Sequence, residues 1–349
     1  MKIAVVGFGH IGRRHATIVN EYPETELVAI VDTNAEARNH ELYPEGVPFY
    51  LSLEEMLKHE SPEVVNICTP NGYHSDQANL CLKNQTHVVI EKPMGLNKAN
   101  CEKVVFRALQ ENKTVFVVKQ NRYSPPSKWL KKIVHEKIIG DVSMVQINCY
   151  WNRDDRYYKP KPSGGPTGWK GSLDLDGGTL FTQFSHFIDI MYWVFGDIEN
   201  IQSTFADFQH QNSTEFEDSG SVNFNFINGG IGTINFSTAV WDQNMESSIT
   251  VVGTKGSLKV GGQYLNEVEY CHIDGYEMEE LDETNPPNDY GPFKGSAANH
   301  HYVIENVVNT LKGRDTITAN ALEGMKVVDI IERIYAAADR PIKSFKHGG

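Results

Sequence analysis

Three glycines near the start of the chain, Gly7, Gly9 and Gly12, follow a short apolar run and open a segment with helical spacing. In such a strand–turn–helix the first glycine permits the tight turn and the second lets the backbone approach a pyrophosphate. The third lets the helix and strand pack closely. The helix N-terminus offers free N–H groups and a positive dipole end to the phosphates. A glycine-rich turn without a ligand is the alternative, but this context favours a dinucleotide site.

Asp32 ends the second apolar run, at residues 27–31, about where a ribose-binding acid belongs. A carboxylate there accepts hydrogen bonds from the ribose 2′-hydroxyl and repels a 2′-phosphate. Asp32 therefore predicts NAD as the cofactor rather than NADP. Because Thr33 and Asn34 follow, a simple turn or helix-capping aspartate is the alternative.

A candidate acid–base residue lies in the segment 177–195, whose spacing predicts one amphipathic helix. Gln183 and His186 share one face of this helix, and Thr182, His186 and Asp189 share an overlapping one. A histidine can take a proton from a hydroxyl at neutral pH, which oxidation of an alcohol to a ketone requires. A helix histidine hydrogen-bonded to Asp189 is the structural alternative.

The stretch 151–170 collects cations and aromatic rings in an otherwise acidic chain. Arginine forks suit phosphate or carboxylate groups, and aromatic rings suit the faces of sugars and bases. With the two helix positions above, the candidate substrate-binding residues are Arg153, Arg156, Tyr157, Tyr158, Trp169, Lys170, Thr182 and Gln183. For any single residue of the stretch, a solvated loop position is an equal alternative.

The first third of the chain alternates short apolar runs with segments of helical spacing. The runs lie at 2–6, 27–31, 63–68, 87–90 and 114–118, and the helical segments at 11–21, 53–59, 75–84 and 98–112. This rhythm predicts βαβ crossovers and a parallel sheet buried on both faces. Ligands of such sheets bind outside the carboxyl ends of the strands.

After residue 122 the pattern changes to strand-like runs joined by turn signals between 198 and 281, with helical patterns at 296–312 and 320–338. Residues 282–295 are predicted to form a surface loop. We expect an NAD-binding Rossmann domain at 1–122 and a substrate-binding and oligomerisation domain at 123–349, with the C-terminal helix able to pack back on the first. The second is predicted as α+β with a large, mostly antiparallel open sheet, whose exposed face favours a homodimer or homotetramer.

Composition narrows the functional classes. A formal net charge of −13 argues against nucleic acid or anionic membranes as partners, while leaving room for an anionic small molecule in a local basic pocket. Five scattered cysteines without a CxxC pair indicate reduced thiols, and neither a disulfide framework nor a metal site is expected. No apolar stretch is long enough to span a bilayer and no signal peptide begins the chain, so we expect a cytoplasmic protein.

Several further motifs occur in a fixed order. Glu91-Lys92-Pro93 ends one strand, and the run from Cys68 to His74 and the triplet Asn121-Arg122-Tyr123 follow two others. Gly177-Gly178 precede His186 and Asp189, and Leu322-Glu323-Gly324 opens the last helix. With these motifs the sequence resembles the Gfo/Idh/MocA oxidoreductases, named for glucose–fructose oxidoreductase and inositol dehydrogenase, over nearly the whole chain.

The resemblance implies which residues lie along the cofactor, with Lys92 beside the nicotinamide. Together with the glycine motif, the candidate cofactor-binding residues are Gly7, Phe8, Gly9, His10, Ile11, Gly12, Asp32, Thr69, Pro70, Asn71, His74, Glu91, Lys92 and Asn121. The Lys92 ammonium can polarise a substrate hydroxyl and stabilise the alkoxide. A solvated lysine at a strand end is the alternative for Lys92.

Many relatives carry Asp or Asn where this chain has Thr182, which leaves Lys92 and His186 as the acid–base candidates. The 151–170 stretch resembles the branch that oxidises C3 of UDP-N-acetylglucosamine or its uronate. The predicted function is therefore NAD-dependent oxidation of a sugar ring hydroxyl to a ketone. A dehydrogenase of a free sugar or polyol such as inositol, and a non-catalytic NAD-binding regulator, are the alternatives.

Overall fold

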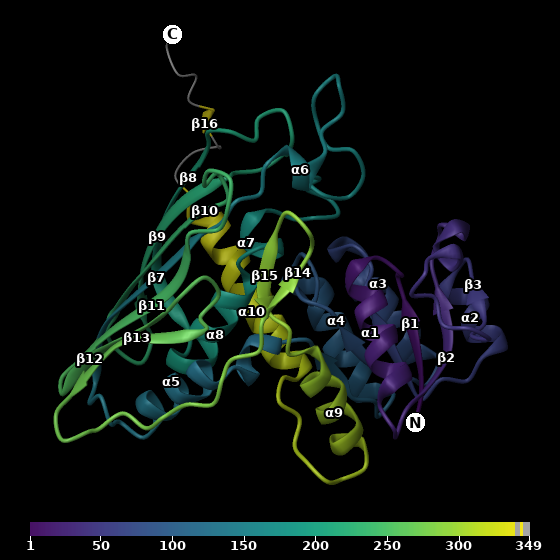
Figure 1. Cartoon of the computed structure of the whole chain (residues 1–349), viewed down its shortest axis with the longest axis horizontal. Helices are drawn as coiled ribbons and strands as arrows, with labels where there is room; N and C mark the ends of the chain where they lie inside the picture. Colours follow the sequence, from purple (N-terminus) through teal and green to yellow (C-terminus); the bar gives the residue numbers. More distant parts are fainter. Residues whose placement is uncertain (339–342, 345–349) are drawn as a thin grey trace. The chain divides into compact units, whose positions relative to one another are not determined.

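The computed structural model describes residues 1–338 and 343–344, and these form two compact units (Figure 1). The first unit comprises Met1–Lys119 and His300–Asp329. The second comprises Gln120–Asn299 and the described residues from Ile330 onward. Helix α10 (Ala321–Ala336) contributes residues to both.

A parallel sheet forms the centre of the first unit. Its strand order is β3-β2-β1-β4-β5-β6, with every neighbouring pair parallel. The strands are β1 (Lys2–Val6), β2 (Glu26–Val31), β3 (Phe49–Tyr50), β4 (Val64–Ile67), β5 (His87–Ile90) and β6 (Val115–Val117). The side chains of β1, β4 and β5 are almost all buried, which explains their continuous apolar sequence.

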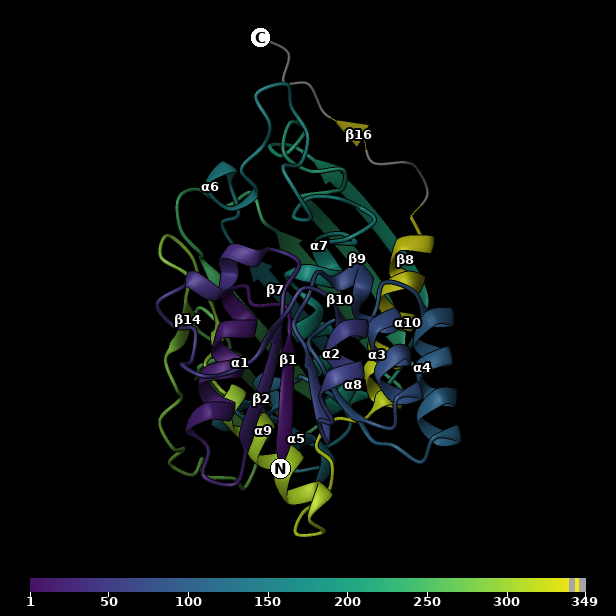
Figure 2. The same cartoon turned by 90° about the vertical axis from the view of Figure 1, so that its right-hand side faces the viewer.

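Helices cover both faces of this sheet. They are α1 (His10–Glu21), α2 (Leu53–His59), α3 (His74–Lys83), α4 (Lys98–Gln110) and α9 (His300–Leu311), with short 3₁₀ turns η1 (Ala35–Asn39) and η2 (Asn71–Tyr73). Figure 2 shows α1 and α9 on one side of the sheet and α3 and α4 on the other. The unit therefore has the Rossmann arrangement that the sequence predicts.

The second unit contains a large sheet of order β13-β12-β11-β7-β10-β9-β8-β16. Its strands are β7 (Val142–Tyr150), β8 (Ile198–Asp207), β9 (Ser219–Phe226), β10 (Ile231–Ser237), β11 (Glu246–Gly253), β12 (Gly256–Gly261), β13 (Glu267–Ile273) and β16 (Lys343–Ser344). Neighbours are antiparallel except for the pairs β7–β10 and β8–β16, so the predicted α+β unit with a mostly antiparallel sheet is confirmed.

Helices lie on one face of the large sheet (Figure 1). They include α5 (Pro125–His135), α7 (Thr179–Thr182) and α8 (Ser185–Phe195), while η3 (Gln120–Tyr123) and α6 (Asp155–Tyr158) are short turns in connecting segments. Residues along β10 alternate between buried and more exposed positions, as expected for a sheet with one face packed and one open.

Two predicted elements were wrong. The segment 177–195 is not one helix, because the chain breaks between α7 and α8 at Gln183 and Phe184. The Thr182 hydroxyl turns back to Asp176, and the Gln183 side chain accepts a hydrogen bond from Arg153. The predicted loop 282–295 contains the hairpin strand β14 (Pro287–Asp289) and the start of β15 (Lys294–Ala297).

Among the described residues, no helix is both long and apolar enough to cross a membrane.

Candidate active site

The cofactor candidates of the first unit follow four adjacent parallel strands. The glycine motif follows β1, Asp32 follows β2, the loop from Thr69 to His74 follows β4, and Glu91 and Lys92 follow β5. Because these strands are neighbours and parallel, their carboxyl ends lie along one edge of the sheet. The topology therefore brings four separate sequence motifs together.

The three motif glycines are required for different reasons. Gly7 has a φ of 88°, and a Cβ there would lie 2.7 Å from the Cys68 carbonyl oxygen. A Cβ on Gly12 would overlap the Gly7 carbonyl oxygen. A Cβ on Gly9, in contrast, would meet no protein atom within 4 Å. Protein packing accounts for Gly7 and Gly12, whereas the open space at Gly9 fits a dinucleotide pyrophosphate lying against the backbone.

The rest of the motif leads directly into α1. Gly9 is the N-cap residue, His10 and Ile11 are the first two helical residues, and Phe8 is buried. The Phe8 N–H donates to Asp32 Oδ2 at 2.7 Å. Asp32 Oδ1 accepts from the Asn34 N–H at 2.9 Å. The carboxylate is thus fixed in orientation, and each oxygen keeps a lone pair for a ribose hydroxyl.

The loop after β4 is tied to the loop after β5 by His74. Its Nε2 lies 2.8 Å from the Thr69 carbonyl oxygen, and its Nδ1 lies 2.7 Å from the Pro93 carbonyl oxygen. Pro70 caps the short turn η2, in which Asn71 is buried. These residues shape the backbone beside the sheet edge.

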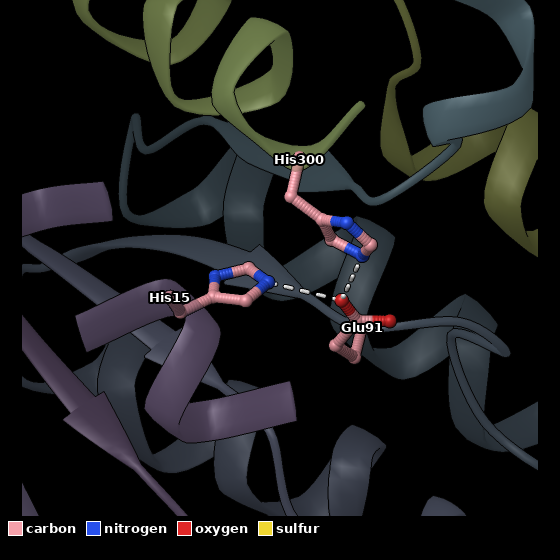
Figure 3. A group of neighbouring side chains, drawn as sticks. All are labelled: His15, Glu91 and His300. Atoms are coloured by element: carbon pink, nitrogen blue, oxygen red, sulfur yellow. Dashed lines mark hydrogen bonds and ion pairs between the residues drawn. The ribbon is translucent and has the colours of Figure 1, made fainter. Parts of the chain in front are cut away.

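Glu91 is buried at the end of β5 and contacts two histidines that the sequence analysis did not single out (Figure 3). His15 Nε2 lies 3.0 Å from Glu91 Oε1, and His300 Nε2 lies 3.5 Å from the same oxygen. The Lys92 N–H donates to Glu91 Oε2 at 3.1 Å. Burial raises the pKa of Glu91, but the hydrogen bonds from His15 and His300 outweigh it and hold the pKa well below its usual range.

In the second unit, His186 is buried near the N-terminus of α8. Its Nε2 lies 3.5 Å from Gln120 Nε2. Asp189 accepts hydrogen bonds from Arg122 Nε at 2.9 Å and Nη2 at 2.8 Å, so its carboxylate is occupied by a buried arginine. Asn121, which lies with Gln120 and Arg122 in the turn η3, donates from Nδ2 to the Ser296 hydroxyl at 3.3 Å.

Asp176 is a fully buried carboxylate that the sequence analysis missed. Its Oδ2 accepts from the Gly171 N–H at 2.7 Å, and the Thr182 hydroxyl donates to Oδ1. The hydroxyl proton of Thr182 is therefore donated to Asp176, at the end of the loop 171–176. The placement of Thr182 among the substrate-binding residues stays a prediction.

Arg153 is 97% buried among aromatic rings, with its guanidinium carbon 4.7 Å from the Trp151 ring centre and 5.4 Å from that of Tyr157. It donates to neutral acceptors alone: Gln183 Oε1 at 2.8 Å, Asn152 O at 2.6 Å, Asn244 Oδ1 at 3.1 Å and Lys294 O at 3.3 Å. Within the described part of the chain, no carboxylate pairs with it. Burial lowers the pKa of Arg153.

A second cation, Lys170, lies over the ring of Tyr157, which Arg153 also contacts. Lys170 Nζ lies 3.9 Å from the centre of the Tyr157 ring, and the Tyr157 hydroxyl accepts from Gln183 Nε2 at 3.0 Å. Burial lowers the pKa of Lys170 to about 8, although Asp176 acts in the opposite sense. Arg153, Tyr157, Lys170 and Gln183 thus form one cluster.

The remaining substrate candidates lie outside this cluster. Arg156 is exposed, and its guanidinium pairs with Asp154 at 2.7 Å and Asp242 at 3.4 Å. Tyr158 is buried against the His210 ring, and Trp169 is half-buried. The sequence gives little sign of three further residues of these sites, because His15, Asp176 and His300 belong to none of the motifs described above. His15 does lie three residues after Gly12, on the same helix.

Comparison with known proteins identifies the family. The model of the oxidoreductase family with an NAD-binding Rossmann fold matches residues 1–119. The model of the GFO/IDH/MocA C-terminal domain matches residues 128–259. Together they cover more than half of the chain.

Similar proteins include two solved structures at 28% identity. The WlbA dehydrogenase from Bordetella pertussis, in complex with NADH and UDP-GlcNAcA, covers 97% of this chain and 96% of its own, with a TM-score of 0.84. The WlbA dehydrogenase from Chromobacterium violaceum, with the same ligands, covers 97% and 93%, with a TM-score of 0.85. The myo-inositol 2-dehydrogenase of Thermotoga maritima is 26% identical over 74% of each chain.

The family models and the open space at Gly9 agree on the cofactor, and the resemblance inferred from the motifs is confirmed. The chain therefore belongs to the Gfo/Idh/MocA oxidoreductases, and its Rossmann unit binds NAD.

Proposed function

We propose that this protein oxidises a ring hydroxyl of a UDP-linked N-acetyl hexose, or of its uronate, to a ketone at C3. The observation that carries the proposal is Arg153, a buried cation that no carboxylate of the described chain neutralises. A buried, unneutralised charge is costly, and an anionic ligand offsets that cost. A diphosphate and a uronate carboxylate are both ligands of this kind.

Lys170 supports the same substrate class. Arg153 and Lys170 contact the Tyr157 ring, and each cation disfavours the charge of the other. An anion bound beside them relieves this repulsion, and the aromatic ring offers a surface for a sugar or base. The two relatives solved with UDP-GlcNAcA point to a nucleotide sugar as the source of the anion.

We assign the proton chemistry to Lys92 and His186. Bound NAD⁺ supplies the hydride acceptor. The Lys92 ammonium polarises the substrate hydroxyl and stabilises the developing alkoxide, while His186 accepts the proton as a neutral imidazole. Cofactor contacts are assigned to the glycine motif, Asp32, the Thr69–His74 loop, Glu91 and Asn121, as expected from the sequence.

Oxidation of a free polyol is the second candidate, because a relative of 26% identity is named a myo-inositol 2-dehydrogenase. An uncharged polyol needs no buried cation. Arg153 would then hold only the hairpin and the Gln183 turn through its neutral acceptors. A panel that contains both substrate classes separates the two candidates.

We also propose a homodimer or homotetramer formed through the open face of the large sheet. Ile231, Met144 and Val252 pair across three adjacent strands and form an exposed apolar row. Exposed rows of this kind on a wide sheet are typical of subunit interfaces. A cytoplasmic location is proposed because all five cysteines, which lie within the described residues, are free thiols.

The test is NADH absorbance with UDP-N-acetylglucosamine, its uronate, inositol and plain hexoses, with products examined by mass. Repeating each reaction with a 2-oxoacid detects turnover when the cofactor does not exchange. Turnover with UDP-sugars alone supports the proposal. Turnover with inositol alone supports the second candidate, and NAD binding without any turnover supports a regulator.

A further inference from the structure

Three buried ionisable side chains from distant parts of the sequence meet at the end of β5 (Figure 3), and one of them, Glu91, directly precedes Lys92. His15 belongs to α1, Glu91 follows β5, and His300 is the first residue of α9. Their exposures are 0%, 5% and 1%. Burying three such groups costs free energy unless they satisfy one another.

The hydrogen-bond directions in this cluster are set by Asn66. Its amide Nδ2 can only donate, and it lies 3.1 Å from His15 Nδ1, which therefore accepts. The His15 proton is then on Nε2, which donates to Glu91 Oε1 at 3.0 Å. His300 Nε2 lies 3.5 Å from the same oxygen. A hydrogen bond from His15 thus holds one oxygen of the carboxylate, and the His300 ring lies beside the same oxygen.

The other oxygen of Glu91 holds the main chain at Lys92. The Lys92 N–H donates to Oε2 at 3.1 Å. On the far side of Lys92, the Pro93 carbonyl oxygen contacts His74 Nδ1 at 2.7 Å, and the Met94 carbonyl accepts from the Ser75 hydroxyl at 3.2 Å. The backbone is therefore fixed both before and after Lys92.

The three ligand atoms lie within 4.8 Å of one another, so a metal ion is the competing occupant. Zinc binds imidazole nitrogen at about 2.0–2.1 Å and requires the unprotonated nitrogen. Here the Nε2 of His15 is protonated and directed at the carboxylate, and the second oxygen of that carboxylate is engaged by the Lys92 N–H. The contacts favour a hydrogen-bonded cluster.

We propose that His15, Glu91 and His300 are positioning residues that hold the Lys92 main chain, and hence its ammonium, in the orientation that the reaction needs. The inference rests on the proposed catalytic role of Lys92. Since α1 also begins at the dinucleotide motif, the cluster ties the cofactor-binding helix to the segment after β5 that contains Lys92. A displacement of about 1 Å at a reacting group can lower a rate about 100-fold.

The test uses Glu91→Gln and His15→Gln, each made in the wild type and in Lys92→Ala. We expect either variant to lower kcat about 10- to 100-fold in the wild type. In His15→Gln, at a residue outside the assigned cofactor contacts, the Kd for NADH and the KM for the sugar should change little. In the Lys92→Ala background the same substitutions should have almost no further effect, because they act through the absent ammonium. Equal losses in both backgrounds would overturn the proposal.

A second readout requires no turnover. The rate at which acetic anhydride modifies Lys92, followed by peptide mass across pH, reports the environment of its ammonium directly. We expect this rate profile to shift in Glu91→Gln and His15→Gln. The matched control is His87→Gln at the opposite end of β5, where His87 Nδ1 accepts from the Thr114 N–H, and this variant should match the wild type.

The two readouts separate the possible failures. If no sugar is turned over but the Lys92 profile shifts, the proposed function fails and the positioning cluster stands. An unshifted profile in folded variants would refute the cluster, and so would a stoichiometric metal ion lost in Glu91→Gln. If Glu91→Gln does not fold, the same kinetic and acetylation measurements are made on Glu91→Asp and His300→Gln.

Discussion

Two arginines that look alike in the sequence have different electrostatic surroundings in the structure. Arg156 is exposed and pairs with Asp154 and Asp242, so its charge is already balanced. Arg153 is buried with neutral acceptors only. Proximity in sequence could not separate them, because Asp154 is close to both arginines in the chain but pairs with Arg156, while Arg153 contacts Asn244, 91 positions away. Only Arg153 has a charge left for a ligand.

This difference predicts the effects of two substitutions. Arg153→Gln should raise the KM for the UDP-sugar about 10- to 100-fold, because a hydrogen bond to a charged group contributes about 1.5–3 kcal/mol. Arg156→Gln should change it no more than about 2-fold, as for a screened surface charge. Initial rates over a substrate range measure both. Equal effects in the two variants would contradict the assignment of Arg153 to the substrate.

Lys170 predicts a pH dependence of substrate binding. Burial lowers its pKa to about 8, so the ammonium is charged below that pH and becomes neutral as the pH rises through it. The KM for an anionic substrate should therefore increase above about pH 8, while the KM for a neutral polyol should not. Lys170→Gln should remove the change. A profile that is the same in wild type and variant would assign the titration to another group.

At the scale of elements, the parallel sheet and its helices could be predicted because apolar runs and helical spacing are local signals. The break between α7 and α8 could not, because it depends on Asp176 and on Arg153, which lies 30 residues from Gln183. The hairpin within 282–297 could not be predicted either, because its short strands are polar and lack the alternation of apolar and polar residues that indicates a strand. Likewise, the three residues around Glu91 come from segments that only the folded sheet brings together.

Substitutions in the glycine motif separate the glycines that packing of the fold requires from the one that cofactor binding requires. Gly9→Ala should raise the Kd for NADH at least about 10-fold and leave the melting temperature unchanged, because the new methyl group meets no protein atom within 4 Å. Gly12→Ala should lower the melting temperature by several degrees, because its Cβ overlaps the Gly7 carbonyl oxygen.

Fluorescence titration and calorimetry measure these two quantities. A loss of thermal stability in Gly9→Ala equal to that in Gly12→Ala would mean that Gly9 serves packing and not the pyrophosphate.

At the scale of the whole molecule, the open sheet face carries the prediction of an oligomer. Met144→Glu places a charge in the centre of the row that Ile231 and Val252 complete. We expect light scattering after gel filtration to show the wild type as a dimer or tetramer and this variant as a 39.3 kDa monomer. Phe106→Glu, at an exposed apolar position on α4, is the control and should leave the assembly intact.

In the proposed reaction, hydride leaves C3 of a UDP-linked N-acetyl hexose or its uronate. The most direct measurement incubates stoichiometric protein and NAD⁺ with the substrate deuterated at C3, then determines the mass of the NADH after denaturation. We expect NADH one mass unit heavier, formed by the wild type and formed far more slowly by Lys92→Ala. Unlabelled NADH would place the oxidation at another carbon. The absence of any NADH with either UDP-sugar would contradict the claim.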